Sequence, residues 1–167
     1  MIIDMGNSTS TTELATAVGE RLALAGHVLA TAESCTGGGI AQAVTAIAGS
    51  SAWFDCGFVT YSNEAKTAML GVKESTLIEH GAVSEAVVRE MAEGALHSSQ
   101  ATLAVSVSGI AGPGGGSKEK PVGTVWLAWS SKNKSTVAAC FSFNGDRESV
   151  RNQAVNEALN GVIKYSV

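Results

Sequence analysis

The sequence predicts an α/β protein, a three-layer α/β/α sandwich on a mixed, largely parallel sheet with a C-terminal hairpin and helix. In the first two thirds of the chain, short apolar strands alternate with helical patterns, which is typical of parallel β-α-β units. In the last third, two strands follow each other directly and a helix closes the chain. The length of 167 residues fits one domain.

The first part of the chain predicts helix, strand, helix and strand in turn. A first helix over about residues 11–25 is indicated by apolar residues at helical spacing, namely Leu14, Val18, Leu22 and Ala25. Residues 27–32 are a short apolar run typical of a strand. A second helix begins at Ile40 and ends at Gly49, and the aromatic and β-branched residues 54–61 predict the next strand.

The middle of the chain predicts three helices and a strand. Residues 63–80 indicate two short helices separated near Gly71. Ser84 is suited to cap a longer helix, whose inner face carries Val87, Val88, Met91, Ala92 and Ala95. Residues 101–110 predict a strand, and a glycine-rich loop over residues 111–121 follows it.

The last third predicts a hairpin and a helix. The hairpin strands cover residues 122–131 and 135–143, and Asp146 is suited to cap the final helix. We expect a flexible N-terminus over residues 1–10, followed by a single domain over residues 11–167.

Composition and charge exclude several classes of function. Charged residues make up only 16% of the chain and hydrophobic residues 45%, which excludes a disordered chain. The net charge is −4, and no run of lysine and arginine could follow a phosphate backbone, so nucleic acid is not an expected partner. Apolar runs fall far short of the ~20 residues that cross a bilayer, so no membrane association is expected either.

The cysteines point to a reducing compartment. The chain has three of them, which are too widely spaced for a zinc motif, and their odd number argues against a secreted disulfide framework. We therefore expect no bound metal and a cytoplasmic protein.

The first candidate site is the turn TAESCTGGG, residues 31–39, between a strand and a helix. Ser34 lies near the positive end of the helix dipole, where free backbone N–H groups can stabilise an oxyanion. Ser34 is therefore a candidate nucleophile, although a helix cap is the commoner role of such a residue. Cys35 fits a small buried thiol better than a nucleophile.

Lys66 is the candidate base for this serine, because none of the three histidines lies in a supporting motif. Asn63 is the expected cap of the helix that follows residue 61, which places Lys66 in the first helical turn. There the helix dipole disfavours a positive charge, and burial would lower the pKa of the amine further. Tyr61 could pass a proton or orient both partners. A solvated surface lysine and a strand-ending tyrosine fit the same positions equally well.

The third candidate is SVSGIAGPGGG, residues 106–116, where a strand ends in a glycine-rich loop. Glycine lets main-chain N–H groups crowd around an anion, so the loop predicts a cradle for phosphate or carboxylate. It is not a Walker A sequence, because no Lys-Ser or Lys-Thr follows the glycines before a helix. A flexible surface loop is the alternative, but the neighbouring Lys118 and Lys120 favour an anion.

Two arginines, Arg147 and Arg151, fall inside the apolar arc of the last helix. An arginine on an inward-facing stripe needs an anionic partner, either a structural carboxylate such as Glu33 or a ligand phosphate. We expect one arginine to be structural and the other to bind a ligand.

Together these segments resemble the C-terminal-domain family of competence/damage-inducible protein A, the nicotinamide mononucleotide deamidases. The resemblance covers about residues 10–163, in the order of the family's motifs. These motifs are TAESCTGG, FVTYSNEAK, LGV followed by GAVSE, SGIAGPGGG followed by KPVGTV, and GDRESVR.

The resemblance implies hydrolysis of the carboxamide of nicotinamide mononucleotide to nicotinate mononucleotide and ammonia, in pyridine nucleotide recycling and without metal or cofactor. By position it implies that Ser34 attacks the carboxamide carbon, with Lys66 as general base and Tyr61 as its hydrogen-bonded partner. The implied oxyanion and substrate site comprises Cys35, Thr36, Gly37, Ser108 and Gly109. The implied phosphate site comprises Gly112, Gly114, Gly115, Gly116 and Arg147 or Arg151.

Many members of this family carry an upstream nucleotide-processing domain, and the chain resembles the stand-alone form without it. A homodimer is expected from the family and from helices rich in glycine and alanine. Two other functions stay open: a catalytically silent phosphate-binding module linked to competence or DNA damage, and a serine amidase or esterase with another small substrate. The simultaneous presence of Ser34, Tyr61 and Lys66 favours the enzyme over the silent module.

Overall fold

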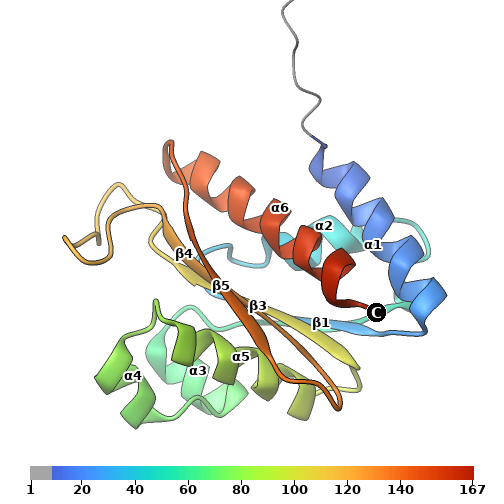
Figure 1. Cartoon of the computed structure of the whole chain (residues 1–167), viewed down its shortest axis with the longest axis horizontal. Helices are drawn as coiled ribbons and strands as arrows, with labels where there is room; N and C mark the ends of the chain where they lie inside the picture. The colour runs from blue at the N-terminus through green and yellow to red at the C-terminus, as the bar shows by residue number, and fades with distance from the viewer. Residues whose placement is uncertain (1–8) are drawn as a thin grey trace, which may run out of the picture.

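A five-stranded sheet with the strand order β2-β1-β3-β4-β5 forms the middle layer of the protein, whose computed structural model describes residues 9–167 (Figure 1). The strands are β1 (Leu29–Glu33), β2 (Phe54–Val59), β3 (Leu103–Gly109), β4 (Thr124–Ser131) and β5 (Val137–Ser142). Strand β1 pairs in parallel with β2 and β3, whereas β4 is antiparallel to both β3 and β5. All strands except β4 therefore run in one direction, which confirms the predicted mixed, largely parallel sheet.

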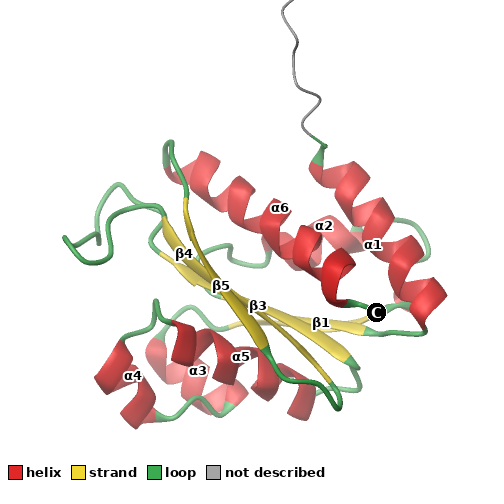
Figure 2. Ribbon diagram, viewed as in Figure 1, coloured by secondary structure: helices red, strands yellow, loops and turns green. Residues whose placement is uncertain are grey.

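Helices cover both faces of this sheet (Figures 1 and 2). One face carries α1 (Thr11–Ala25), α2 (Gly39–Thr45) and α6 (Arg147–Tyr165). The other face carries α3 (Asn63–Leu70), α4 (Glu74–His80) and α5 (Glu85–His97). The predicted three-layer sandwich is confirmed, and so are the C-terminal hairpin and helix.

The helix ends follow local signals in the sequence. The side chains of Ser84 and Asp146 accept hydrogen bonds from the backbone of the first helical turn, as predicted, and Gly71 ends α3 in a left-handed conformation. The second predicted helix is too long: α2 ends at Thr45, and a short 3₁₀ turn at Ser50–Ala52 separates it from β2.

The predicted flexible N-terminus lies mostly outside the described residues. Within these, the chain from Ser10 onward is ordered by a capping box, in which Ser10 and Glu13 exchange hydrogen bonds between side chain and backbone. None of the described helices combines the length and the apolar character that crossing a bilayer requires.

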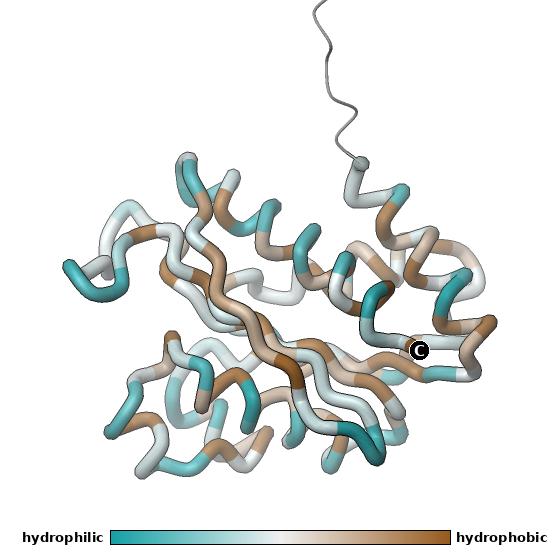
Figure 3. Tube along the Cα trace, viewed as in Figure 1, coloured by the Kyte–Doolittle hydropathy of each residue, from teal (hydrophilic) through white to brown (hydrophobic). Residues whose placement is uncertain are grey.

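Each face of the sheet has its own hydrophobic core. The core beneath α1, α2 and α6 contains Trp129, whose indole N–H donates to the carbonyl of Ala158 on α6 at 3.0 Å. The core beneath α5 is built mainly from alanine, valine and Met91. Hydrophilic residues lie away from both cores, at the tip of the β4–β5 hairpin and at the tip of the loop between β3 and β4 (Figure 3).

Helix α5 packs so closely on the end of α3 that residue 94 must lack a side chain. A Cβ at Gly94 would lie 1.9 Å from the carbonyl oxygen of Leu70, which is backbone and cannot rotate away. We therefore predict that Gly94→Ala lowers the free energy of unfolding by about 1–3 kcal/mol, although alanine favours helices. Urea unfolding measures this. The control, Asn160→Ala at an exposed site of α6, should change stability by less than about 0.5 kcal/mol. Equal stabilities of Gly94→Ala and wild type would contradict this packing.

Candidate active site

Three strand ends meet at one edge of the sheet and bring distant parts of the sequence together. Ser34 follows β1, Thr60 follows β2, and Ser108 lies near the end of β3. Backbone bonds tie these ends to one another: the N–H of Ser34 donates to Val107 at 3.0 Å, and the N–H of Thr60 donates to Glu33 at 2.9 Å. Ligands of open α/β sheets bind at this edge, outside the carboxyl ends of the strands.

The amine of Lys66 is buried against the hydroxyl of Ser34. Lys66 is only 1% exposed, and its Nζ lies 3.1 Å from Ser34 Oγ. The same nitrogen contacts the carbonyl oxygens of Thr60 at 2.9 Å and Tyr61 at 3.3 Å. No carboxylate of the described residues forms an ion pair with it. Burial therefore lowers the pKa of Lys66 from its ordinary value of 10.5, because nothing compensates fully for lost hydration of the charge.

Lys66 reaches this place from the first part of α3, but the cap of that helix is Ser62 and not Asn63 as predicted. Ser62 has extended backbone angles, and its hydroxyl accepts from the N–H of Ala65 at 3.1 Å. The N–H of Lys66 accordingly donates to the carbonyl of Ser62, at 3.1 Å. The helix therefore begins at Asn63, and Lys66 is its fourth residue.

Tyr61 contacts Lys66 through its backbone and not through its phenol. The carbonyl accepts from the amine, whereas the mostly exposed phenol oxygen lies 3.2 Å from Arg147 Nη2, which donates to it. The partner of Lys66 is thus the main chain of Tyr61, and this geometry gives no route for a proton between the phenol and the amine.

Cys35 is not in a form suited to nucleophilic attack. Its thiol is buried, and burial raises its pKa to about 11, so the reactive thiolate is not populated near neutral pH. The serine beside it is consequently the better nucleophile of the two.

The turn that carries Ser34 is held from inside the protein by Glu33. This carboxylate is fully buried and accepts three hydrogen bonds, from the hydroxyl of Thr36 at 2.6 Å and from the N–H groups of Ile40 at 2.8 Å and Ala41 at 3.0 Å. Neither Arg147 nor Arg151 forms an ion pair with it, so Glu33 is not the structural carboxylate that the sequence analysis offered as one of two possible kinds of partner. The carboxylate instead satisfies donors at the beginning of α2.

The turn leaves backbone donors free close to the nucleophile. The N–H of Gly37 donates to the carbonyl of Ser34 at 3.0 Å, the N–H of Thr36 has no acceptor among the described residues, and the N–H of Cys35 contacts only the thiol of its own side chain. Free main-chain donors beside a nucleophile are the usual material of an oxyanion hole.

The glycine-rich loop and Ser34 line the same pocket. This pocket has a volume of about 280 Å³. It is lined by Ser34, Cys35, Tyr61, Lys66, Ser108, Gly109, Gly112, Gly114, Gly115 and Arg147 among the residues that the sequence analysis singled out. Gly112 and Gly115 have positive φ, and Arg147 Nη1 donates to the carbonyl of Gly112 at 2.8 Å. Arg147 thus joins the loop to Tyr61 across one side of the pocket.

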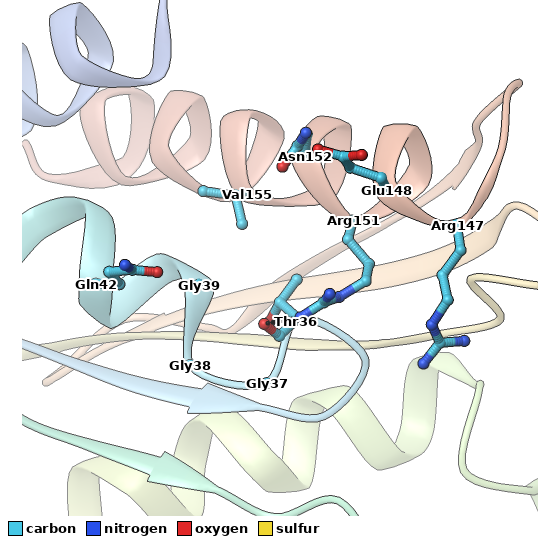
Figure 4. A pocket seen from close by; sticks show the side chains of 10 residues that line it. All are labelled: Thr36, Gly37, Gly38, Gly39, Gln42, Arg147, Glu148, Arg151, Asn152 and Val155. Atoms are coloured by element: carbon cyan, nitrogen blue, oxygen red, sulfur yellow. Dashed lines mark hydrogen bonds between the residues drawn. The ribbon is translucent and has the colours of Figure 1, made fainter.

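Four other candidates lie outside this pocket. Thr36, Gly37 and Arg151 line a neighbouring hollow of about 770 Å³ between α2 and α6, which shares only Arg147 with the first (Figure 4). Gly116 lines neither hollow, and it packs so closely on the backbone of Val122 that an added Cβ would lie 2.8 Å from its nitrogen.

The pocket also contains residues that sequence reasoning missed. Asn63, Ala82 and Val83 line it, together with Ile110 and Ala111. Ala82 and Val83 belong to the GAVSE motif, which carries part of the family resemblance but gives no indication that these residues line the pocket. Nothing in a short apolar segment indicates from sequence that it faces a ligand.

Comparisons with known proteins match almost the whole chain. The family model described as the CinA C-terminal domain matches residues 11–166. Nicotinamide-nucleotide amidohydrolase PncC of Escherichia coli strain K12 is 58% identical over 147 residues, which are 88% of this chain and 89% of that protein. The same-named protein of Pseudomonas putida is 54% identical, over 92% and 95%. The crystal structure of competence/damage inducible protein CihA from Agrobacterium tumefaciens superposes with a TM-score of 0.90 and 47% identity, over 98% of each chain.

The role of Glu33 can be tested by an almost isosteric change. In Glu33→Gln, the amide oxygen replaces only one of the two carboxylate oxygens, so the NH₂ would face either the N–H of Ala41 or the donors of Thr36 and Ile40 and leave at least one buried donor without an acceptor. We predict a loss of about 2–4 kcal/mol in the free energy of unfolding, measured in urea. Glu20→Gln, on the exposed side of α1, is the control and should unfold like wild type. An equally stable Glu33→Gln protein would refute the anchoring role.

Proposed function

The chain belongs to the CinA C-terminal domain family, and from this we propose that it hydrolyses the carboxamide of nicotinamide mononucleotide, giving nicotinate mononucleotide and ammonia in pyridine nucleotide salvage. Relatives that are 54–58% identical to it, among them those of Escherichia coli strain K12 and Pseudomonas putida, are named nicotinamide-nucleotide amidohydrolase. These relatives are matched over most of their own length, so the proposal concerns the activity of whole proteins of this size.

The observation that carries the proposal is the contact between Lys66 and Ser34. A neutral amine has two hydrogens and one lone pair. The carbonyls of Thr60 and Tyr61 can only accept, so they take the two hydrogens and leave the lone pair for the third neighbour, Ser34 Oγ, at 3.1 Å. This arrangement suits an amine that removes the proton of the serine hydroxyl.

Acylation then follows the chemistry of a Ser-Lys pair. The Ser34 oxygen attacks the carboxamide carbon while its proton moves to Lys66. The oxyanion that forms accepts from the N–H of Cys35, which lines the pocket, and from the N–H of Thr36, the next residue of the turn. Ser108 or Gly109, which also line the pocket, are further donors. When the tetrahedral intermediate collapses, the C–N bond breaks and the leaving nitrogen takes the proton of the Lys66 ammonium, departing as ammonia.

Deacylation repeats these steps with water. Neutral Lys66 accepts a proton from a water molecule, whose oxygen attacks the ester carbon. The ester bond breaks, the proton returns to Ser34, and nicotinate mononucleotide is released. Neither half of the reaction requires a metal or an organic cofactor, because Lys66 serves as acid and base in both.

The ribose phosphate would lie against the glycine-rich loop. Gly112, Gly114 and Gly115 line the same pocket as Ser34 and expose main-chain atoms to a ligand, and Arg147 supplies a positive charge beside them. The contacts of Arg147 with Gly112 and Tyr61 use Nη1 and Nη2, so its Nε–H remains available to a phosphate.

The proposal extends to a homodimer in the cytoplasm that acts on a small molecule and not on nucleic acid. Four exposed apolar residues support an association between copies: Val59, Tyr61, Met69 and Ile78, on the end of β2 and on α3 and α4. The net charge of −4 argues against nucleic acid.

A catalytically silent phosphate-binding module is the alternative, linked to the competence and damage functions that the names of several related structures mention. Such a module needs the glycine-rich loop and an arginine. It has no use for a lysine buried against a serine, which is unfavourable for stability, so the contact of Lys66 with Ser34 favours the enzyme.

We predict that the wild-type protein releases ammonia from nicotinamide mononucleotide and that Ser34→Ala does not, because the nucleophile is gone. Nicotinamide riboside, which lacks the phosphate, should react with a much higher KM. A coupled ammonia assay measures both substrates. Absence of ammonia with wild type would exclude the enzyme, and equal kinetics with the riboside would exclude the phosphate site.

The activity should rise with pH and reach a plateau above the pKa of Lys66, which burial holds below 10.5, because only the neutral amine accepts the serine proton. Lys66→Met should fold but show no turnover. The unfolded chain keeps its proton on Lys66 up to pH 10.5, whereas the folded chain releases it earlier. Wild-type stability relative to Lys66→Met must therefore increase with pH between these two values. An active Lys66→Met protein would assign the base elsewhere.

A further inference from the structure

The guanidinium of Arg151 binds the backbone of the turn that follows the nucleophile. Its Nε donates to the carbonyl of Cys35 at 3.0 Å, and its Nη2 donates to the carbonyl of Thr36 at 3.1 Å, across 116 and 115 residues of sequence. Figure 4 shows the side chain extending from α6 to Thr36 and Gly37, while Arg147 points to a different part of the site.

These two contacts set the direction of a free donor. In a trans peptide the C=O and the N–H point in opposite directions, so the carbonyl of Cys35, held by Arg151, turns the N–H of Thr36 away from the arginine. That N–H has no acceptor among the described residues. The positively charged guanidinium that binds the carbonyl oxygen of Cys35 also polarises this peptide, which makes the N–H of Thr36 a stronger donor. The second contact holds the Thr36–Gly37 peptide, whose N–H in turn holds the carbonyl of Ser34.

The chain is shaped to admit this arginine. Gly37 has a φ of +60°, and a Cβ there would lie 3.3 Å from Arg151 Nη2, so a side chain would press against the guanidinium. Arg151 has no carboxylate partner within residues 9–167. It also lines only the hollow beside the catalytic pocket, whereas Arg147 lines both. Its charge is therefore directed at the turn and not at the place where the ribose phosphate would lie.

We infer that Arg151 is a positioning residue for the oxyanion site and not a phosphate ligand: it fixes and polarises the peptide that presents the Thr36 N–H to the substrate oxyanion. Glu33 holds the same segment by accepting from the hydroxyl of Thr36 and from the N–H of Ile40 at the beginning of α2. The inference rests on the proposed amidohydrolase activity, and it divides the two arginines, with Arg147 left for the phosphate.

The two roles separate in steady-state kinetics with nicotinamide mononucleotide. Arg151→Met should lower kcat by about tenfold or more, since loss of one oxyanion donor costs 10²–10³ and here the donor is only weakened, while KM changes by less than about threefold. Arg151→Lys should recover part of kcat through a single contact. Arg147→Met, the matched comparison one turn away, should instead raise KM. A raised KM with unchanged kcat in Arg151→Met would overturn the inference.

A second measurement does not depend on the substrate. Amide hydrogen exchange of the segment 34–38 should be faster in Arg151→Met than in wild type, because the carbonyls that Arg151 restrains are released, while β3 exchanges equally in both. Unchanged exchange in that segment would overturn the positioning role. If the wild type released no ammonia, the proposed function would fail by that result, whereas the exchange rates would still decide whether Arg151 holds the turn.

Discussion

Burial of the Lys66 amine without a carboxylate is the constraint on which the site depends. A carboxylate within a few ångströms would hold the amine protonated and make it useless as a base. Glu33 immediately precedes the nucleophile, yet its oxygens accept from Thr36, Ile40 and Ala41 and not from the amine. The amine is left with neutral oxygens only, which stabilise its N–H groups without restoring the charge.

These neutral oxygens are backbone carbonyls that follow the end of strand β2. Strand β2 stops at Val59, so the carbonyls of Thr60 and Tyr61 have no partner in a neighbouring strand and would otherwise need water. Lys66 satisfies them both. The same edge supplies Ser34 from β1 and Ser108 from β3, and the backbone bonds between the three strand ends fix their separation. The site is thus a consequence of strand termination as much as of its side chains.

Most of the fold could be predicted from sequence because its signals are local. Caps such as Ser84 and Asp146 and the apolar stripe of α5 need only neighbouring residues to be recognised. The choice of Ser62 over Asn63 as a cap could not be made, because both residue types cap helices well. The burial of Lys66 also has no local signal. It follows from the tertiary structure, which brings the Lys66 amine of α3 to Ser34 after β1. The distance between these residues along the chain does not reveal this contact.

The two arginines illustrate why the remaining part of the site escaped prediction. Amphipathic spacing predicts that Arg147 and Arg151 lie on the inner side of α6, which holds for the half-buried Arg151, whereas Arg147 at the beginning of the helix is exposed. Chemistry then suggests anions as their partners. Apart from the phenol of Tyr61, the protein partners are backbone carbonyls instead, at Gly112 for Arg147 and at Cys35 and Thr36 for Arg151. A carbonyl has no signature in a sequence because every residue carries one. Four residues of helix separate the arginines by about 6 Å along the axis. That distance is enough to bring one guanidinium over the glycine-rich loop and the other over the nucleophile turn. A single helix can therefore stabilise two loops that face each other across the catalytic pocket, and a rotation of α6 would disturb both at once.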